Sequence, residues 1–402
     1  MDQKIHRVLL VHLHLQARSV TTNENDFQEN SINETVFVRP PFGAIFELKN
    51  HNNFPNIVTI FDHLDSPGKK NNNRYRETSA NTNELSHKSN GSSLGSQEAS
   101  EFLAIPKLMK YYKKHSNDNS LVIFGGDTNI ENDNFNLDKN FDSDIEKVLT
   151  TLGIGQKYFT SINRDGTGYV QPYDKMFYLN GENNYYDVIN DKDDPKLDFK
   201  IDIIKEFNKF SNKEEFKLMK WYKRSENENW NIRNRLSDHA PVYLDLNVKT
   251  NERINTSNAI INPKKDSNHL RIAHWNILNY GNDDLNKYRR EKEFKYKAIA
   301  KFIDNSGFDI VGLTEINDNG SVAVDLILEE LNKNNHNKYK KIVQSVDDSS
   351  WKNTKYSHFD GKQTEQIVII YNSEILNSVN FNNNKNHLTY REKIKLYGEI
   401  KK

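Results

Sequence analysis

The spacing of hydrophobic residues predicts a chain that mixes short strands with fewer helices. Val242, Leu244 and Leu246 alternate with Tyr243 and Asp245, which is the period of a half-buried strand. Short, mainly apolar runs predict further strands at 8–15, 57–61, 121–124, 173–179, 270–279, 309–316 and 364–372. Apolar residues at helical spacing predict helices at 96–109, 141–152, 201–210, 214–222, 294–303 and 321–331.

Polar side chains stand where several of these strands end or begin. They are His63, Asp127, Asn129, Asp174, Asp238, His239 and Glu315. An adjacent carboxylate and imidazole, as in Asp238-His239, can bind a metal and polarise a phosphate oxygen. Asp127 and Asn129 are two positions apart, so both face one side of an extended segment, and Gly125-Gly126 is expected to let the backbone turn tightly before them. For each of these side chains a purely structural role, such as an ordinary turn, is the alternative.

Composition excludes several classes of protein. The 402 residues contain 56 Lys plus Arg and 56 Asp plus Glu, so the formal net charge is zero. This argues against a nucleic-acid binder that works by bulk electrostatics, but not against an enzyme with a local site. The absence of cysteine excludes disulfides and thiolate chemistry. No transmembrane run, signal peptide or lipid anchor is indicated, so localisation stays open.

Three polar stretches interrupt the pattern. Residues 69–95 predict a long exposed loop, and residues 247–268, which include Asn262-Pro263, predict a linker. The basic and aromatic string at 217–224 has two interpretations, either contact with a polyanion or a helix with a solvated face. The linker divides the chain into two segments.

Taken together, the motifs resemble the endonuclease/exonuclease/phosphatase superfamily, which has the deoxyribonuclease I-like fold. Within it they are closest to the membrane nucleases of mycoplasma-type bacteria. The matching stretches are Arg39-Pro40-Pro41-Phe42, His63-Leu64-Asp65-Ser66-Pro67, Gly125-Gly126-Asp127-Thr128-Asn129, Tyr173-Asp174-Lys175, Ser237-Asp238-His239-Ala240-Pro241, His274-Trp275-Asn276-Ile277, Leu313-Thr314-Glu315-Ile316 and Glu365 to Tyr371. Each stretch alone is a weak signal, whereas the full set is specific.

The order of these motifs differs from that of the family, where the Asn and Glu motifs come first. Here residues 1–246 carry the family's C-terminal half and residues 269–402 its N-terminal half, joined by 247–268. A circular permutation, a fusion of tandem copies and a disrupted reading frame are the three explanations. We favour one permuted domain over residues 1–402, with a complete site formed in a monomer or across a swapped dimer.

The resemblance implies an α/β fold, a four-layer α-β-β-α sandwich of two mixed β-sheets. It also implies metal-assisted hydrolysis of phosphodiester bonds in DNA, with RNA as a further substrate. Glu315 would bind the cation with help from Asn276 and Asp238. Mg²⁺ fits these oxygen ligands, with Mn²⁺ or Ca²⁺ as alternatives.

The same resemblance assigns the remaining roles. Asp127 would activate the attacking water, and Asn129 would hold the phosphate, as would Asn276. Two imidazoles would flank the phosphorus, each held by a carboxylate: His239 by Asp174, and His63 by Glu365. Arg39 has two interpretations, a contact to a backbone phosphate or a structural salt bridge.

Other functions are possible within and outside the superfamily. Sphingomyelinases and inositol-phosphate phosphatases share the fold, but neither an aromatic membrane-docking hairpin nor a lysine-rich pocket is visible in the sequence. A rearranged, noncatalytic remnant is the alternative of a different class. The motif set is intact, which favours an active enzyme.

Overall fold

The computed structural model describes residues 34–67, 80, 85, 94–116, 119–147, 156–179, 185–189, 198–211, 228–254, 256–281, 289–317, 320–333, 338–355 and 364–396. The strand predicted at 8–15, the helix at 214–222 and the basic-aromatic string at 217–224 lie outside these residues, as does most of the 69–95 loop.

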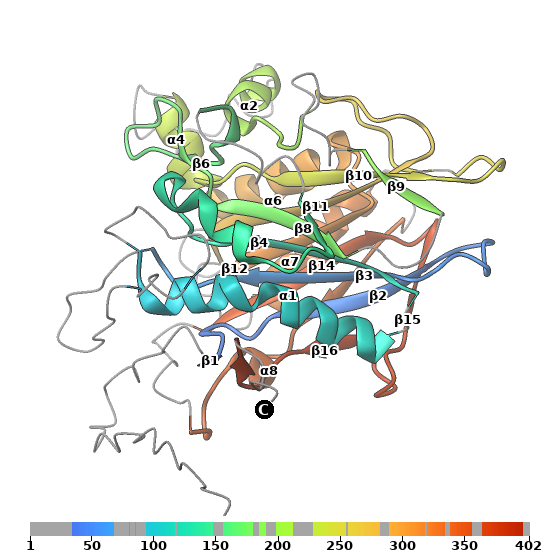
Figure 1. Ribbon diagram of the computed structural model, residues 1–402. Coiled ribbons are helices and arrows are strands. Elements are labelled where there is room, and N and C mark those ends of the chain that lie inside the picture. The colour runs from blue at the N-terminus through green and yellow to red at the C-terminus, as the bar shows by residue number, and fades with distance from the viewer. Residues whose placement is uncertain are drawn as a thin grey trace, which may run out of the picture.

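Two mixed β-sheets pack face to face (Figure 1). The first sheet has the order β13 (Tyr339–Val343), β14 (Glu365–Asn372), β12 (Ile310–Asn317), β11 (His269–Tyr280), β10 (Val242–Val248) and β9 (Tyr186–Val188). The second has the order β15 (Leu376–Val379), β2 (Phe42–Leu48), β3 (Ile57–His63), β4 (Leu121–Asp127), β8 (Asp174–Leu179) and β5 (Ile145–Lys147), with β16 (His387–Thr389) also on β2. In each sheet one central pair, β11–β12 or β3–β4, is parallel, and its neighbours are antiparallel.

Helices cover the outer face of each sheet (Figure 1). The second sheet is covered by α1 (Ser96–Ser116), and the first by α6 (Arg289–Asn305), α7 (Ser321–Asn332), α2 (Ile203–Ser211) and α4 (Glu228–Arg235). Smaller elements are β1 (Glu34–Thr35) paired with β17 (Ile394–Lys395), β6 (Ser161–Ile162) paired with β7 (Tyr169–Gln171), η1 (Asn132–Asn140), η3 (Gln156–Tyr158) and α8 (Val346–Ser349). Within the described ranges, no helix combines the length and apolar character needed to cross a bilayer.

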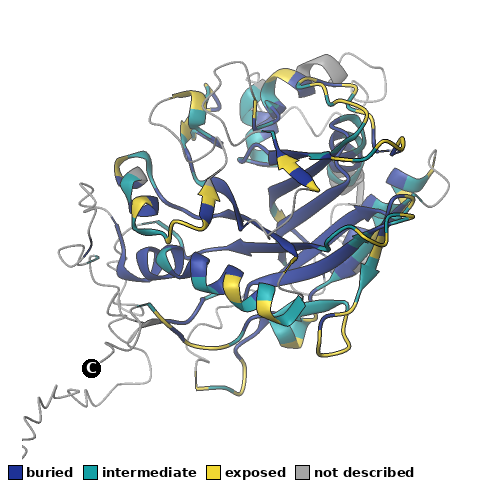
Figure 2. Ribbon diagram, turned by 45° about the vertical axis from the view of Figure 1, so that its right-hand side comes forward, coloured by how far each residue is buried: buried dark blue, intermediate teal, exposed yellow. Residues whose placement is uncertain are grey.

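The side chains form three apolar layers, which explains the strand periodicity. Leu244 and Ile272 point into the core between the sheets, whereas their chain neighbours Tyr243 and Ala273 point into the core beneath α6 and α7. The third layer joins α1 to the second sheet, for example through Phe102. Figure 2 accordingly shows the central strands as buried, with exposure at the loops. The predicted four-layer α-β-β-α sandwich of two mixed sheets is confirmed.

Each of the two sheets contains strands from both sides of the linker. β10 and β11 pair antiparallel, with Val242 opposite His274 and Leu246 opposite Leu270. In the second sheet β15 pairs with β2. Part of the linker is held by Arg271, whose guanidinium donates to the carbonyl of Pro263 at 2.9 Å. The two segments are therefore interleaved in both sheets.

The helix predicted at 141–152 is wrong where the structure describes this stretch. Residues Ile145–Lys147 form β5, an edge strand antiparallel to β8 in which Ile145 lies opposite Leu179. The apolar positions fit a helix, but the hydrogen bonds offered by the sheet edge decide the conformation. Local propensity is a weak determinant when a tertiary partner is available.

Candidate active site

The predicted strand-end residues meet at one edge of the two sheets. Parallel strands end there and their antiparallel neighbours begin there, so His63 at the end of β3 lies opposite Asp127 at the end of β4, and Asp127 opposite Asp174 at the start of β8. In the first sheet Glu365, at the start of β14, lies opposite Asn317 at the end of β12. The backbone N–H of Asn129 donates to Asp127 Oδ1 at this edge. The side chains brought into contact there are Arg39, His63, Asp127, Asp174, His239, Asn276, Glu315 and Glu365.

The Asp127 carboxylate is the centre of this group. Its Oδ2 atom lies 3.6 Å from His63 Nε2 and 3.5 Å from His239 Nε2, and it accepts a hydrogen bond from the Asn276 amide at 3.0 Å. The Asp127 side chain is only 2% exposed. One carboxylate oxygen thus faces two imidazoles and an amide with little water around it.

The first imidazole, His63, is held from behind by Glu365. His63 Nδ1 lies 2.7 Å from Glu365 Oε2, and Arg39 Nε lies 2.9 Å from the same oxygen. Burial alone would raise the pKa of Glu365, but Arg39 and His63 reverse that effect and lower it to about 2. Burial and Arg39 oppose protonation of His63, yet the Glu365 and Asp127 carboxylates outweigh them and raise its pKa.

The second imidazole, His239, is held by Asp174 in the same way. His239 Nδ1 lies 2.7 Å from Asp174 Oδ2, and the Asp174 side chain is fully buried. Burial would lower the pKa of His239, but Asp174 and Asp127 raise it well above the ordinary value. Burial would raise the pKa of Asp174, and the imidazoles of His239 and His274 lower it instead.

The Ser-Asp-His motif owes its shape to backbone hydrogen bonds. The His239 N–H donates to Ser237 Oγ at 2.9 Å, and the His239 carbonyl accepts from Trp275 Nε1 at 2.9 Å. The Ser237 hydroxyl is buried and donates to the Asn276 carbonyl at 2.6 Å. Ser237 therefore anchors the loop and has no access to a substrate.

Glu315 and Asn276 form the third part of the site. The Asn276 amide nitrogen donates to Glu315 Oε1 at 2.9 Å, while its oxygen accepts from the Leu278 N–H at 3.0 Å. The other Glu315 oxygen accepts from the Asn279 N–H at 2.9 Å. Glu315, Leu278 and Asn279 all have left-handed φ angles, of 58°, 51° and 47°. Strained non-glycine residues of this kind concentrate at functional sites.

Two overlapping groups of side chains can hold a divalent cation. Asp127, Asp174 and His239 offer ligand atoms within 4.8 Å of one another. His239 Nδ1 and Asp174 Oδ2 already share a hydrogen bond, so a cation bound through those two atoms would break it. The second group is Glu315, whose side chain is 16% exposed, and Asp127, and the Asn276 amide nitrogen bonds to both carboxylates. Carboxylate oxygens of this type are hard donors, which suit a hard divalent cation.

Three predicted residues have contacts that bear on their roles. Arg39, besides Glu365, donates to the carbonyls of His63 at 3.1 Å and Leu64 at 2.9 Å, which fits the salt-bridge interpretation. The Asn129 amide donates to the Leu64 carbonyl at 3.0 Å. The Asp238 carboxylate forms an ion pair with Arg233 at 3.4 Å.

His274 is a buried residue of the site that sequence reasoning did not assign to it. Its Nδ1 lies 3.5 Å from Asp174 Oδ1. The only signal in the sequence was its place within the stretch that carries Asn276.

The Gly125-Gly126 pair lies inside β4 and makes no turn, so the predicted reason for it was wrong. A Cβ atom at Gly125 would come within 3.0 Å of His274 Cβ and 3.2 Å of the Phe61 ring, and one at Gly126 within 2.8 Å of the Asp62 carbonyl. Gly125 is therefore required by close packing against the first sheet, and Gly126 by the close approach of the neighbouring strand β3.

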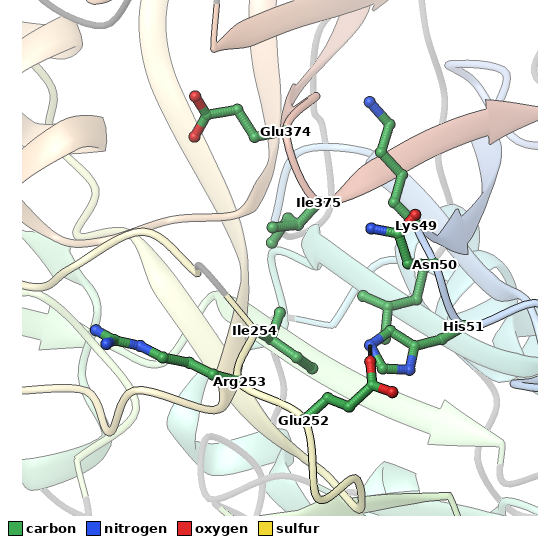
Figure 3. Close-up of a pocket in the computed structure, with 9 residues that line it drawn as sticks. Lys49, Asn50, His51, Glu252, Arg253, Ile254, Glu374 and Ile375 are labelled. Atoms are coloured by element: carbon green, nitrogen blue, oxygen red, sulfur yellow. Dashed lines mark ion pairs between the residues drawn. The ribbon is translucent and has the colours of Figure 1, made fainter.

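A separate cavity of about 470 Å³ lies at the opposite ends of β2, β10 and β14. Its charged lining residues include Lys49, His51, Glu252, Arg253 and Glu374 (Figure 3). His51 and Glu252 form an ion pair at 3.8 Å, and Lys49 donates to the Ser373 carbonyl at 2.5 Å. These groups are partly engaged with one another, and we assign no chemistry to the cavity.

No family model and no curated protein sequence matches this chain. Among solved structures, one match is to humanised D. rerio TDP2 carrying 14 mutations, with 12% sequence identity. The match covers 34% of this chain and 47% of the other, so it spans less than half of that protein, and its TM-score is 0.19. A TM-score this low supports no conclusion about the fold or the function of this chain.

Proposed function

We propose that this protein is a metal-dependent hydrolase of phosphodiester bonds, with DNA as its substrate. One observation carries the proposal: a single carboxylate, Asp127, lies between the Nε2 atoms of His63 and His239. Each of these imidazoles has its own carboxylate behind Nδ1. The motif resemblance to the endonuclease/exonuclease/phosphatase superfamily supports the same conclusion independently of these distances.

The electrostatics favour an anionic substrate. The Glu365 and Asp127 carboxylates raise the pKa of His63, and Asp174 and Asp127 raise that of His239, so the charged form of each imidazole is favoured and each Nε2 would be a charged donor. Two positively charged donors would attract an anionic substrate, and the carboxylate between them would activate the water that attacks it. Asp127 would accept the proton from that water, and one imidazole would protonate the leaving oxygen. Which imidazole does so stays open.

The remaining residues would position these groups. Asn276 would fix the positions of the Asp127 and Glu315 carboxylates relative to each other, and Asn129 would contact the phosphate. Glu315 would be the main ligand of a divalent cation, with Asn276 and Asp238 near it. A bound Mg²⁺, Mn²⁺ or Ca²⁺ ion would neutralise negative charge on the phosphate oxygens.

A serine-hydrolase mechanism is the natural competitor, since Ser237, His239 and Asp174 have the right residue types. Ser237 Oγ, however, bonds to backbone atoms: it donates to the Asn276 carbonyl at 2.6 Å and accepts from the His239 N–H at 2.9 Å. A nucleophilic serine must instead lie at hydrogen-bond distance from the imidazole Nε2. Here that nitrogen faces Asp127.

The chain order fits one permuted domain. The pairing of β10 with β11 and the contact of Asn276 with Asp127 support it, because they join residues from opposite sides of the linker. Both contacts join residues of one chain, which supports a monomer whose site needs no strand exchange.

Incubation of the purified protein with plasmid DNA tests the proposal. We expect cleavage with Mg²⁺ or Mn²⁺ and none in excess chelator, and loss of cleavage in the Asp127→Asn variant. Full activity in chelator would refute the metal requirement. Activity on a phosphomonoester alone would favour a phosphatase of the same superfamily, and no hydrolysis under any condition would favour a noncatalytic remnant.

A further inference from the structure

A fully buried third imidazole, His274 on β11, lies directly behind the His239–Asp174 pair. Its Nδ1 atom is 3.5 Å from Asp174 Oδ1, and the other oxygen of Asp174 is 2.7 Å from His239 Nδ1. Both side chains have no exposed surface. The Asp174 carboxylate is thus enclosed between two imidazoles.

The two atoms that face each other, Asp174 Oδ1 and His274 Nδ1, lack other hydrogen-bond partners in the part of the chain that the structure describes. A buried polar atom without a partner is costly, so native structures pair such atoms. Each atom is therefore the natural partner of the other, and a small approach from 3.5 Å completes the bond.

The direction of this bond follows from the neighbouring groups. The pKa of Asp174 is lowered by the two imidazoles despite burial, so its carboxylate is ionised and only accepts hydrogen bonds. Nδ1 of His274 must then carry the hydrogen. His274 Nε2 lies 3.1 Å from Thr314 Oγ1, and that hydroxyl is able to donate to it.

The surrounding strands hold the His274 ring rigidly. Its plane lies at 21° to the Phe61 ring, with 6.3 Å between the centroids. On its backbone side, a Cβ atom at Gly125 would come within 3.0 Å of His274 Cβ, so the packing leaves little space for movement. A donor with a fixed position also fixes the orientation of the carboxylate that it binds.

We propose that His274 is a positioning residue: it clamps the Asp174 carboxylate, which in turn aims His239 Nε2 at Asp127. Without this clamp Asp174 can rotate about its terminal bond. The 3.5 Å approach of His239 to Asp127 would then be lost for part of the time. Small displacements of a reacting group reduce rates strongly.

Two variants of similar size separate positioning from packing. In His274→Asn the amide nitrogen takes the place of imidazole Nδ1 and still reaches Asp174. In His274→Gln it takes the place of Nε2 and reaches Thr314 instead. Thr314→Val is a third variant, which keeps the imidazole and removes the hydroxyl that fixes its tautomer.

Two readouts are required, one of them independent of catalysis. The first is the NMR resonance of the His239 Nδ1–H proton in the metal-free protein, assigned by its loss in His239→Asn. The second is kcat and KM on DNA. We expect His274→Gln to broaden or shift the resonance and to lower kcat by about 10-fold with KM unchanged. We expect His274→Asn to retain the resonance and to keep kcat within about threefold of the unmodified protein.

An unchanged resonance and kcat in His274→Gln would overturn the inference. Equal losses in the Asn and Gln variants, with equal drops in urea midpoint, would reduce His274 to a packing residue. If His274→Gln fails to fold, Thr314→Val decides, with a shifted resonance for the inference and an unchanged one against it. The kinetic readout rests on the proposed function, whereas the resonance does not, so an inactive protein would refute the function and still test the clamp.

Discussion

The amide nitrogen of Asn276 lies 3.0 Å from Asp127 Oδ2, although 149 residues separate the two positions. The same nitrogen lies 2.9 Å from Glu315 Oε1. One amide thereby holds together carboxylates from the two segments of the chain. Without it, two negative charges would face each other in a poorly solvated place.

Asn276→Ala should disable the site while leaving the fold largely intact. The carboxylates of Asp127 and Glu315 would lose their shared donor and move apart, so we expect the rate of DNA cleavage to fall by about 10²-fold. Asn377→Ala is the matched control, because the Asn377 amide bonds to Glu47 on an exposed sheet edge. Comparable losses in both variants would contradict the role given to Asn276.

The two imidazoles facing Asp127 should each be essential. His63→Ala and His239→Ala should lower kcat by about 10²-fold or more, the usual contribution of a general acid or base. His51→Ala, in the remote cavity, should change kcat by less than about twofold, since it touches no group of the site. A strong effect at His51 together with a weak one at His239 would reverse the assignment.

The stability of the protein in chelator should depend on pH in two windows. The pKa values of His63 and His239 are raised, so their stabilising interactions are complete below about 6.5 and are lost as the pH rises through the raised values. The pKa of Glu365 is lowered from 4.5 to about 2, so its contribution is present above 4.5 and is lost as the pH falls through about 2. The free energy of unfolding, measured in urea from pH 2 to 10, should therefore be greatest between these two windows.

Single variants identify the groups responsible. His239→Asn should flatten the alkaline side of this profile, and Glu365→Gln the acid side. The Glu365 window alone corresponds to about 3 kcal/mol, at about 1.4 kcal/mol per pKa unit. Profiles that keep their slopes in both variants would show that other groups dominate.

Gly125→Ala should be destabilising because of packing. The added methyl group would meet His274 Cβ at 3.0 Å and the Phe61 ring at 3.2 Å, and forced displacement in a packed core costs about 1–3 kcal/mol. Gly168→Ala is the control, since nothing lies within 4 Å of a Cβ atom there. Urea midpoints measure both, and equal midpoints would refute the packing explanation.

The ion pair at the junction of the segments should contribute strongly to stability. Arg271 is fully buried and its guanidinium donates to both carboxylate oxygens of Asp245 at 2.8 Å, so Arg271→Leu removes the cationic half of a buried ion pair and should cost about 3–5 kcal/mol. Lys110→Ala removes an exposed pair with Asp142 and should cost less than about 1 kcal/mol. The free energy of unfolding in urea measures both effects. An unchanged free energy in Arg271→Leu would show that this ion pair does not hold the two segments together.

The sequence by itself determined the central strands β3, β4, β8, β10, β11, β12 and β14 and the polar residues that stand at their ends. Alternation reports the two faces of a strand, so Leu244 and Tyr243 could be placed on opposite faces before any partner was known. Motif resemblance supplied the pairing of His63 with Glu365, across 302 residues.

Only the tertiary structure decided what each face packs against. It made Ile145–Lys147 an edge strand instead of a helix, gave Gly125 its packing role, turned Arg39 towards Glu365 and placed His274 behind Asp174. The physical reason is that periodicity records burial, which is a local property of the chain. Sheet pairing and side-chain contacts instead join residues far apart in sequence, and they are settled only when both partners are in place.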